Sequence, residues 1–176
     1  TPGHKDFGED TYCALLAADS VVMVLDAAKG VEEQTRKLFA VSKRHRLPML
    51  TFINKMDTHG RDPLELIDEV ESVLGIHAAP MNWPIGVGDR FRGVYHLHDH
   101  QVLLYERHLQ GQRPAPVEVA DRHDPALAEL VGDEPHREFL ESSALVAAAG
   151  ATFDREEYLA GRQTAVYFGS ALHNFC

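Results

Sequence analysis

The tetrapeptide Asn54-Lys55-Met56-Asp57 follows a run of apolar residues, and its side chains have the chemistry to recognise a purine base. A carboxylate at Asp57 can accept two parallel hydrogen bonds, one from a ring N–H and one from an exocyclic amine. Guanine presents that pair of donors and adenine does not, and each charge-assisted hydrogen bond contributes about 1.5–3 kcal/mol. The stem of Lys55 can cover a base face, and Asn54 can donate and accept within the loop. The alternative is a solvated turn, because Asn and Asp favour turns.

A second polar segment, Phe168-Gly169-Ser170-Ala171, follows the last apolar run of the chain. Loops at the carboxyl ends of neighbouring parallel strands face the same pocket, so this segment is expected beside the Asp57 loop. A small residue in the segment would let a backbone N–H approach a base oxygen, and Ser170 could orient the Asp57 carboxylate. An ordinary turn from a strand into a helix is the alternative.

A third candidate is the first segment of the chain, Thr1-Pro2-Gly3-His4. The glycine would allow the Gly3 backbone N–H to approach a terminal phosphate. The imidazole of His4 could orient an attacking water. When so short a motif is taken alone, a plain turn explains it better.

These polar segments follow apolar runs that have the pattern of buried strands. Residues 20–26, 48–53 and 164–168 are nearly continuous apolar runs, as in parallel strands with both faces covered. Helices are predicted over 31–46 and from the cap residue Asp62 to Gly75, with a proline at the first helical position. Strands alternating with helices at this spacing predict an α/β fold with a parallel sheet and helical crossovers.

From residue 80 the pattern changes to short runs separated by glycines. The expected elements are an antiparallel hairpin and then helices, over residues 94–97, 102–105, 125–131 and 134–149. We therefore expect residues 80–163 to form an α+β insertion subdomain. Residues 1–79 would be one part of the α/β core, and residues 164–176 would return to that core as a strand and a pocket loop.

The charge balance limits the classes of partner. The 176 residues contain 17 Lys and Arg against 27 Asp and Glu, a net charge of −10. Such an acidic chain is not expected to grip DNA or an anionic membrane over a broad surface. The sequence shows no signal peptide and no apolar run long enough for a membrane span, and its two cysteines fit a reducing compartment. We expect a cytoplasmic protein.

Two further clusters have simpler explanations. Three histidines alternate along one expected strand and would share a face, where they could bind zinc, but a solvent-facing strand edge explains them better. A basic cluster lies on the helix predicted over 31–46, where it complements the helix dipole; contact with ribosomal RNA is the alternative. The residues concerned are His96, His98 and His100, and Arg36, Lys37, Lys43, Arg44 and Arg46.

The three candidate segments occur together, in this order, on the strand ends of one predicted sheet. In this the chain resembles the translational GTPases of the phosphate-loop class, and within that class the bacterial peptide release factor GTPases. The resemblance spans essentially all 176 residues. Elongation factor G shares the order of motifs and the place of the insertion, and it is the alternative. The resemblance is carried by Thr1–Phe7, Asp26–Val31, Asn54–Asp57, Arg61–Pro63, Trp83–Gly86, Gly93–His96 and Phe168–Leu172.

The resemblance implies a Rossmann-like P-loop GTPase domain, in which residues 1–79 are the C-terminal half of the GTP-binding core. It implies that Asp57 reads the guanine ring, while Asn54 and Lys55 shape the pocket. The loop that backs the base would be Ser170, Ala171 and Leu172.

On the phosphate side, the resemblance implies that Gly3 senses the terminal phosphate and that His4 is the catalytic residue that positions the hydrolytic water. The implied ligands are GTP and GDP, with Mg²⁺. The implied partners are the ribosome and the codon-specific release factors, whose departure after peptide release the family promotes with GTP hydrolysis.

The sequence also departs from the family pattern. It contains no Gly-x-x-x-x-Gly-Lys-Ser/Thr, the motif that supplies backbone donors and a lysine to the phosphates and a hydroxyl to magnesium. We therefore expect a truncated domain whose Mg²⁺ ligands lie elsewhere, and we assign the GTPase activity to a longer parent protein. A non-catalytic interaction module that self-associates through an exposed sheet edge is the other hypothesis.

Overall fold

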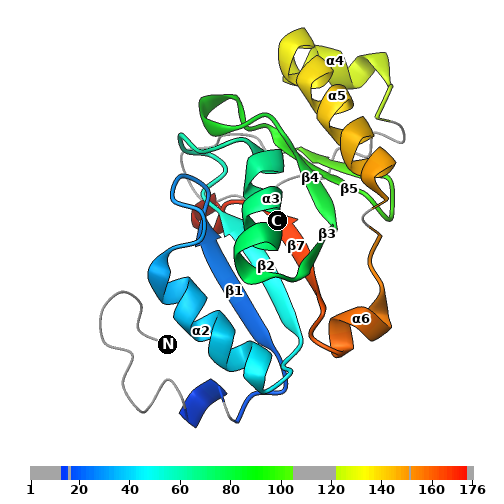
Figure 1. The fold of residues 1–176 in the computed structure, drawn as a ribbon. Coiled ribbons are helices and arrows are strands. Elements are labelled where there is room, and N and C mark those ends of the chain that lie inside the picture. Colours follow the sequence, from blue (N-terminus) through cyan, green and yellow to red (C-terminus); the bar gives the residue numbers. More distant parts are fainter. Residues whose placement is uncertain (1–12, 16, 105–121, 151, 174–176) are drawn as a thin grey trace.

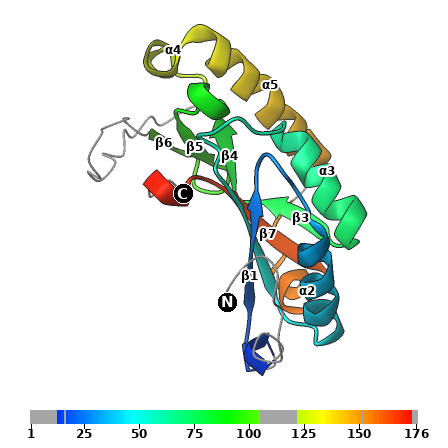
Figure 2. The ribbon, with the colours of Figure 1, turned by 90° about the vertical axis from the view of Figure 1, so that its left-hand side faces the viewer.

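The computed structural model describes residues 13–15, 17–104, 122–150 and 152–173 (Figure 1). Gly3 and His4 lie outside the described residues, so their predicted roles are not placed by the structure. The described part of the chain forms a parallel sheet with two helices against it, and a second, smaller sheet with a helical pair beyond it (Figures 1 and 2).

Four parallel strands form the core sheet, in the order β1-β2-β7-β3. The predicted α/β fold with a parallel sheet is therefore confirmed. Strand β7 is the last strand in the sequence, yet it lies between β2 and β3, so the chain returns to the interior of the sheet. The bounds are Val21–Asp26 for β1, Met49–Asn54 for β2, His77–Pro80 for β3 and Gln163–Phe168 for β7.

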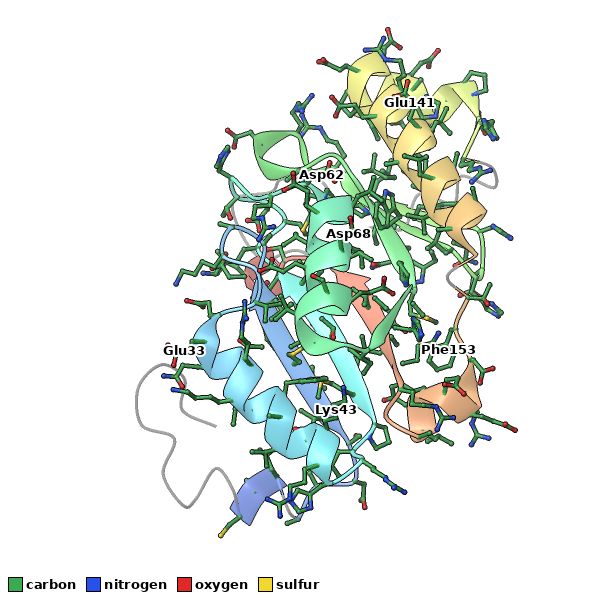
Figure 3. All side chains as sticks on the ribbon, in the orientation of Figure 1. Glu33, Lys43, Asp62, Asp68, Glu141 and Phe153 are labelled. Carbon is green, nitrogen blue, oxygen red and sulfur yellow. The ribbon has the colours of Figure 1, made fainter. Side chains whose placement is uncertain are left out.

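Helices α2 (Glu33–Arg44) and α3 (Pro63–Leu74) cover the same face of the core sheet (Figure 2). Both helices were predicted from the sequence, over 31–46 and from Asp62 to Gly75. Helix α3 begins where the Asp62 carboxylate accepts a hydrogen bond from the Leu64 backbone N–H at 2.8 Å. Figure 3 shows Asp62 at that end of the helix. The helix ends at Gly75, which has φ 60°, a conformation that favours glycine.

The carboxyl ends of the two helices are tied together by one lysine. Lys43, in the last turn of α2, donates hydrogen bonds from its Nζ to the carbonyl oxygens of Leu74, at 3.3 Å, and Gly75, at 3.1 Å. Both carbonyls belong to the end of α3, where backbone acceptors lack partners within the helix. A cation at this position also complements the negative end of the helix dipole.

Within the part of the chain that the structure describes, strand β1 is covered on one face only. Met23 and Leu25 are buried beneath the helices, whereas Val22 and Val24, on the other face, are 62% and 58% exposed. The expectation that both faces of this strand are covered is therefore wrong. A continuous apolar run predicts a strand, but it carries no information about what lies on each face.

After β3 the described chain forms a three-stranded antiparallel sheet, β4-β5-β6, and continues with helices. The predicted hairpin is confirmed as β5 and β6, and the two predicted helices as α4 and α5. The bounds are β4 Asn82–Ile85, η1 Gly88–Arg90, β5 Gly93–His96, β6 Gln101–Leu104, α4 Pro125–Val131, α5 Asp133–Ala149 and α6 Arg155–Leu159.

Strand β4 joins the small sheet to the core. The buried side chain of Asn82 donates to the carbonyl oxygen of Phe168 at 3.0 Å and accepts from its backbone N–H at 2.7 Å. The neighbouring Trp83 packs edge-on against the Phe168 ring, with centroids 5.3 Å apart. The indole N–H of Trp83 donates to the Ser142 hydroxyl of α5 at 2.9 Å. Core, small sheet and α5 are thus packed together at the end of β7.

Candidate functional site

The first two predicted polar segments meet at the carboxyl edge of the core sheet. Strands β2 and β7 pair in parallel, with Ile53 opposite Phe168, so the loops that follow them start side by side. The Gly169 backbone N–H donates to the Ile53 carbonyl at 3.0 Å, and the Met56 N–H donates to the Gly169 carbonyl at 3.1 Å. Figure 1 shows the last short helix, η2 (Ala171–His173), next to the end of β2.

The Asn54 side chain joins the two loops directly. Its Oδ1 accepts hydrogen bonds from the backbone N–H of Lys55 at 2.8 Å and from that of Ala171 at 2.9 Å. The two donors belong to different loops, and the hydrogen bond between Ala171 and Asn54 joins residues 117 positions apart in the sequence. One amide oxygen therefore sets the spacing between the loop of Asp57 and the segment that was expected to back a base.

The loop after Asn54 is a tight turn built around Lys55. Lys55 has φ 68°, which is unusual for a residue with a side chain and costs about 1–2 kcal/mol. Its carbonyl oxygen accepts from the backbone N–H of Thr58 at 3.1 Å and from the Thr58 hydroxyl at 2.9 Å. Met56 is fully buried and its carbonyl accepts from the Gly88 N–H at 2.8 Å. These contacts hold the backbone on both sides of Asp57, which is itself half-buried.

The Lys55 ammonium is paired with an acid to which sequence reasoning gave no role at the site. Its Nζ lies 2.7 Å from Oδ2 of Asp26, the last residue of β1. The hydrogen bond to Asp26 and the charge of that carboxylate raise the pKa of Lys55. Burial by itself would raise the pKa of Asp26, but hydrogen bonds from Lys55 and from the Ala28 N–H, with the charges of Lys55 and Lys29, lower it overall.

Ser170 occupies the place predicted for it, but it does not act on Asp57. Its side chain is 1% exposed, and its hydroxyl makes no hydrogen bond with any residue that the structure describes. The expectation that Ser170 orients the Asp57 carboxylate is therefore wrong for this structure. A buried hydroxyl without a partner costs free energy unless a ligand supplies one, so the atom fits a place where a polar ligand binds. Ala171 and Leu172 are exposed at the rim.

The histidine run does not form a metal site. Across the described ranges, no group of three or more His, Cys, Asp or Glu side chains is placed to hold a metal ion. Nδ1 of His100 instead lies 2.8 Å from the Tyr95 hydroxyl, within the β5–β6 hairpin. The zinc hypothesis therefore has no support among these residues. Among the described helices, none combines the length and apolar character that a membrane span requires.

Two hollows lie apart from the candidate loops. One, of about 570 Å³, lies between α3, β3 and the end of α5 and includes Ile67 and Val146; the other, of about 500 Å³, includes Arg61 and Phe139. None of the predicted site residues lines either hollow. The candidate site is therefore defined by the contacts between its two loops rather than by these hollows.

Sequence reasoning gave no site role to two residues that hold these strand ends, Asp26 and Asn82. Asp26 ends an apolar run just as Asn54 does, and the two residues lie opposite each other in the β1–β2 register. That shared position at strand ends was a usable signal for Asp26. Asn82 had no such signal, because its strand is four residues long and contains a proline.

The whole chain matches a known family of domains. Residues 1–176 match the family described as Elongation factor Tu GTP binding domain. Peptide chain release factor 3 of Gloeobacter violaceus is 49% identical over 175 residues, covering 99% of this chain and 33% of that relative. The protein of the same name from Trichodesmium erythraeum is 49% identical over 175 residues, covering 99% of this chain and 32% of that relative. The chain thus spans about a third of the length of these curated relatives.

A solved structure supports the fold. A crystal structure of a protein from Thermus thermophilus superimposes with a TM-score of 0.67 at 24% identity, covering 98% of this chain and 27% of that one. This likeness shows the fold, and it agrees with the α/β architecture of the chain. The chain belongs to the family of elongation factor Tu GTP-binding domains.

Proposed function

We propose that this chain is the guanine-recognising part of a GTPase that acts in translation termination. The observation that supports this most is the bridge made by Asn54, whose side chain holds the Asp57 loop against the Ala171 loop. The curated relatives named Peptide chain release factor 3 favour termination over the elongation factor G alternative. Because the chain spans a third of those relatives, the activity belongs to the longer protein.

In this proposal Asp57 accepts the two donors on the guanine edge, and the Lys55 stem covers one face of the ring. Adenine lacks that pair of donors, and a half-buried carboxylate left without them penalises the wrong base. Ser170, Ala171 and Leu172 would back the base on the other side. The buried Ser170 hydroxyl, which has no partner among the described residues, supports a polar ligand there.

The phosphate side is proposed from the sequence alone. The Gly3 backbone N–H would sense the terminal phosphate of GTP, and His4 would orient the water that attacks it, which leaves GDP and inorganic phosphate. Mg²⁺, when bound, neutralises charge on the phosphates; its ligands are expected outside this chain.

We further propose the division of the chain that its pattern predicts. Residues 1–79 and 164–176 would belong to the nucleotide-binding core, and 80–163 would be the insertion. The return of β7 to a place between β2 and β3 supports this division, since it puts both core segments in one sheet. The proposed partners are the ribosome and codon-specific release factors, and the proposed location is the cytoplasm, where ribosomes work.

The test is base selectivity in the full-length protein that carries this chain. Titration with GDP, ADP and xanthosine diphosphate should show a strong preference of the wild type for GDP. Asp57→Asn should weaken GDP binding by about tenfold or more and improve binding of xanthosine diphosphate, whose carbonyl needs a donor. The matched control is Asp68→Asn, an exposed acid on α3 (Figure 3), which should change neither. Unchanged selectivity in Asp57→Asn would refute the role given to that carboxylate.

A further inference from the structure

The geometry points to Asp26 as a positioning residue for base recognition. We infer that its carboxylate holds the Lys55 side chain in place before the nucleotide arrives, so that the lysine stem is already set over the base face. This inference rests on the proposed guanine site and adds a residue to it. It separates two tasks: Asp57 selects the base by its edge, and Asp26 with Lys55 sets affinity through the face.

The parallel pairing of β1 and β2 brings the two residues together. Asp26 and Asn54 are opposite each other in the register, so Lys55 leaves the sheet beside the end of β1. The Lys55 Nζ then reaches Oδ2 of Asp26 at 2.7 Å. A side chain that leaves a backbone with φ 68° and ends on a fixed carboxylate is held at both ends.

Asp26 is the fixed partner of this pair and Lys55 the exposed one. The Asp26 side chain is 18% exposed, against 56% for that of Lys55. The other carboxylate oxygen of Asp26, Oδ1, accepts from the Ala28 N–H at 2.9 Å. Its backbone carbonyl accepts from the N–H groups of Lys29, at 3.0 Å, and Gly30, at 2.8 Å. The strand end therefore holds the acid, and the acid holds the lysine.

Holding Lys55 in advance has a direct effect on affinity. A free lysine side chain loses much rotamer freedom when it is ordered against a ligand, and that loss reduces binding. Where an ion pair has already ordered it, the nucleotide meets a preorganised surface. An exposed ion pair contributes little to folding stability. If the Asp26–Lys55 pair had only a structural role, its removal would therefore have almost no effect on GDP affinity. The two roles thus differ in what they predict for binding.

The contributions of contacts with the face and with the edge of the base can be separated by experiment. Hypoxanthine lacks the exocyclic amine of guanine, so the ratio of GDP to inosine diphosphate affinity reports on the edge. Asp26→Asn keeps an oxygen that can accept from Ala28 but removes the charge that holds Lys55. We expect it to weaken GDP and inosine diphosphate equally, roughly tenfold, with their ratio unchanged. Asp57→Asn should instead change the ratio.

The decisive measurement is a double-mutant cycle in the full-length protein, by calorimetric titration with GDP. Lys55→Met keeps an aliphatic stem but loses the ammonium, so it should weaken binding as much as Asp26→Asn does. The double variant should be no worse than either single variant, because both changes break the same contact. The matched control is Glu33→Gln, which removes the exposed Glu33–Lys37 pair of 2.8 Å on α2, away from the candidate loops (Figure 3).

The outcomes distinguish the inference from the function beneath it. If the wild type binds no guanine nucleotide, the proposed function fails and the role of Asp26 falls with it. If the wild type binds GDP and Asp26→Asn binds equally well, only the role of Asp26 fails. Additive losses in the double variant would also overturn it, because Asp26 would then act independently of Lys55. Circular dichroism of each variant shows that lost binding is not lost folding.

Discussion

Two asparagines use the same chemistry on either side of the end of β7, and they differ in burial. Asn82 is fully buried and bonds both backbone groups of Phe168. Asn54 is half-exposed and uses one oxygen to join the N–H groups of Lys55 and Ala171. Water can replace the contacts of Asn54 but not those of Asn82. From this comparison we expect the buried amide of Asn82 to matter most for stability, and the amide of Asn54 at the rim to matter most for the proposed binding site.

The largest expected effect comes from breaking the buried bridge. Asn82→Ala leaves the N–H and the carbonyl of Phe168 without their partners in the interior. Because unsatisfied buried groups are costly, we expect the free energy of unfolding to fall by about 3 kcal/mol. Urea unfolding followed by circular dichroism measures it. Asn82→Asp places an oxygen against the Phe168 carbonyl and buries a charge, so it should lose at least as much; equal stability of Asn82→Ala and wild type would contradict the assignment.

A smaller loss of stability is expected from the exposed bridge. Asn54→Ala frees two N–H groups that water can reach, so the free energy of unfolding should fall by only about 1 kcal/mol. The affinity of the full-length protein for GDP should fall more steeply, because the spacing between the two loops is no longer set. Unfolding and GDP titration on the same preparation check both. A stability loss as large as that of Asn82→Ala would erase the distinction between the two residues.

The hydrogen bond between Trp83 and Ser142 should contribute still less to folding stability. Ser142→Ala removes the acceptor of the Trp83 indole N–H, at a part-buried place between β4 and α5. We expect a loss of about 0.5–1 kcal/mol in the free energy of unfolding, and no change in GDP affinity. The same urea titration measures it. An effect on GDP binding would show that α5 and the loops of the candidate site are more tightly linked than the comparison suggests.

The smallest expected effect is a dependence of folding stability on pH, which arises at Asp26. Because the pKa of Asp26 is lowered in the folded protein, its ionised form adds stability above the unfolded value of 3.8, and that stability is lost as pH falls through the lower folded value. The difference in stability between wild type and Asp26→Asn should therefore be present at pH 6 and shrink towards pH 3. Asn82 carries no charge, so its contribution should not follow this course. Unfolding curves at several pH values check it.

The elements of the fold that carry strong local signals were predictable. Helix α3 begins at the cap residue Asp62 and ends at Gly75, because a capping carboxylate and a left-handed glycine act within one turn of the chain. Strand β4 was not predictable, because four residues that include a proline have no clear period. Nor was the exposed face of β1, since Val22 and Val24 differ from Met23 and Leu25 in what packs on them rather than in their chemistry.

In the candidate site, too, some features were predictable from the sequence and others were not. The meeting of the Asn54 and Ala171 loops followed from the rule that parallel strands end at one edge. The orientation of the Ser170 hydroxyl did not, because a rotamer depends on neighbours that the sequence does not order in space. The Asp26–Lys55 pair depends on the register of two strands, and a sequence run gives each strand without its alignment to the next. The roles of Gly3 and His4 stay predictions.

The late position of β7 has a consequence for how this chain folds during its synthesis. Strand β2 can bond β7 only after more than a hundred further residues have been made, as the 115-residue separation of the Met49–Thr164 hydrogen bond shows. Strand β3 pairs with β7 alone in the core sheet, so it has no sheet partner until then. Such distant pairing makes closure slow. Until β7 has been made, β2 and β3 therefore lack the strand that joins them.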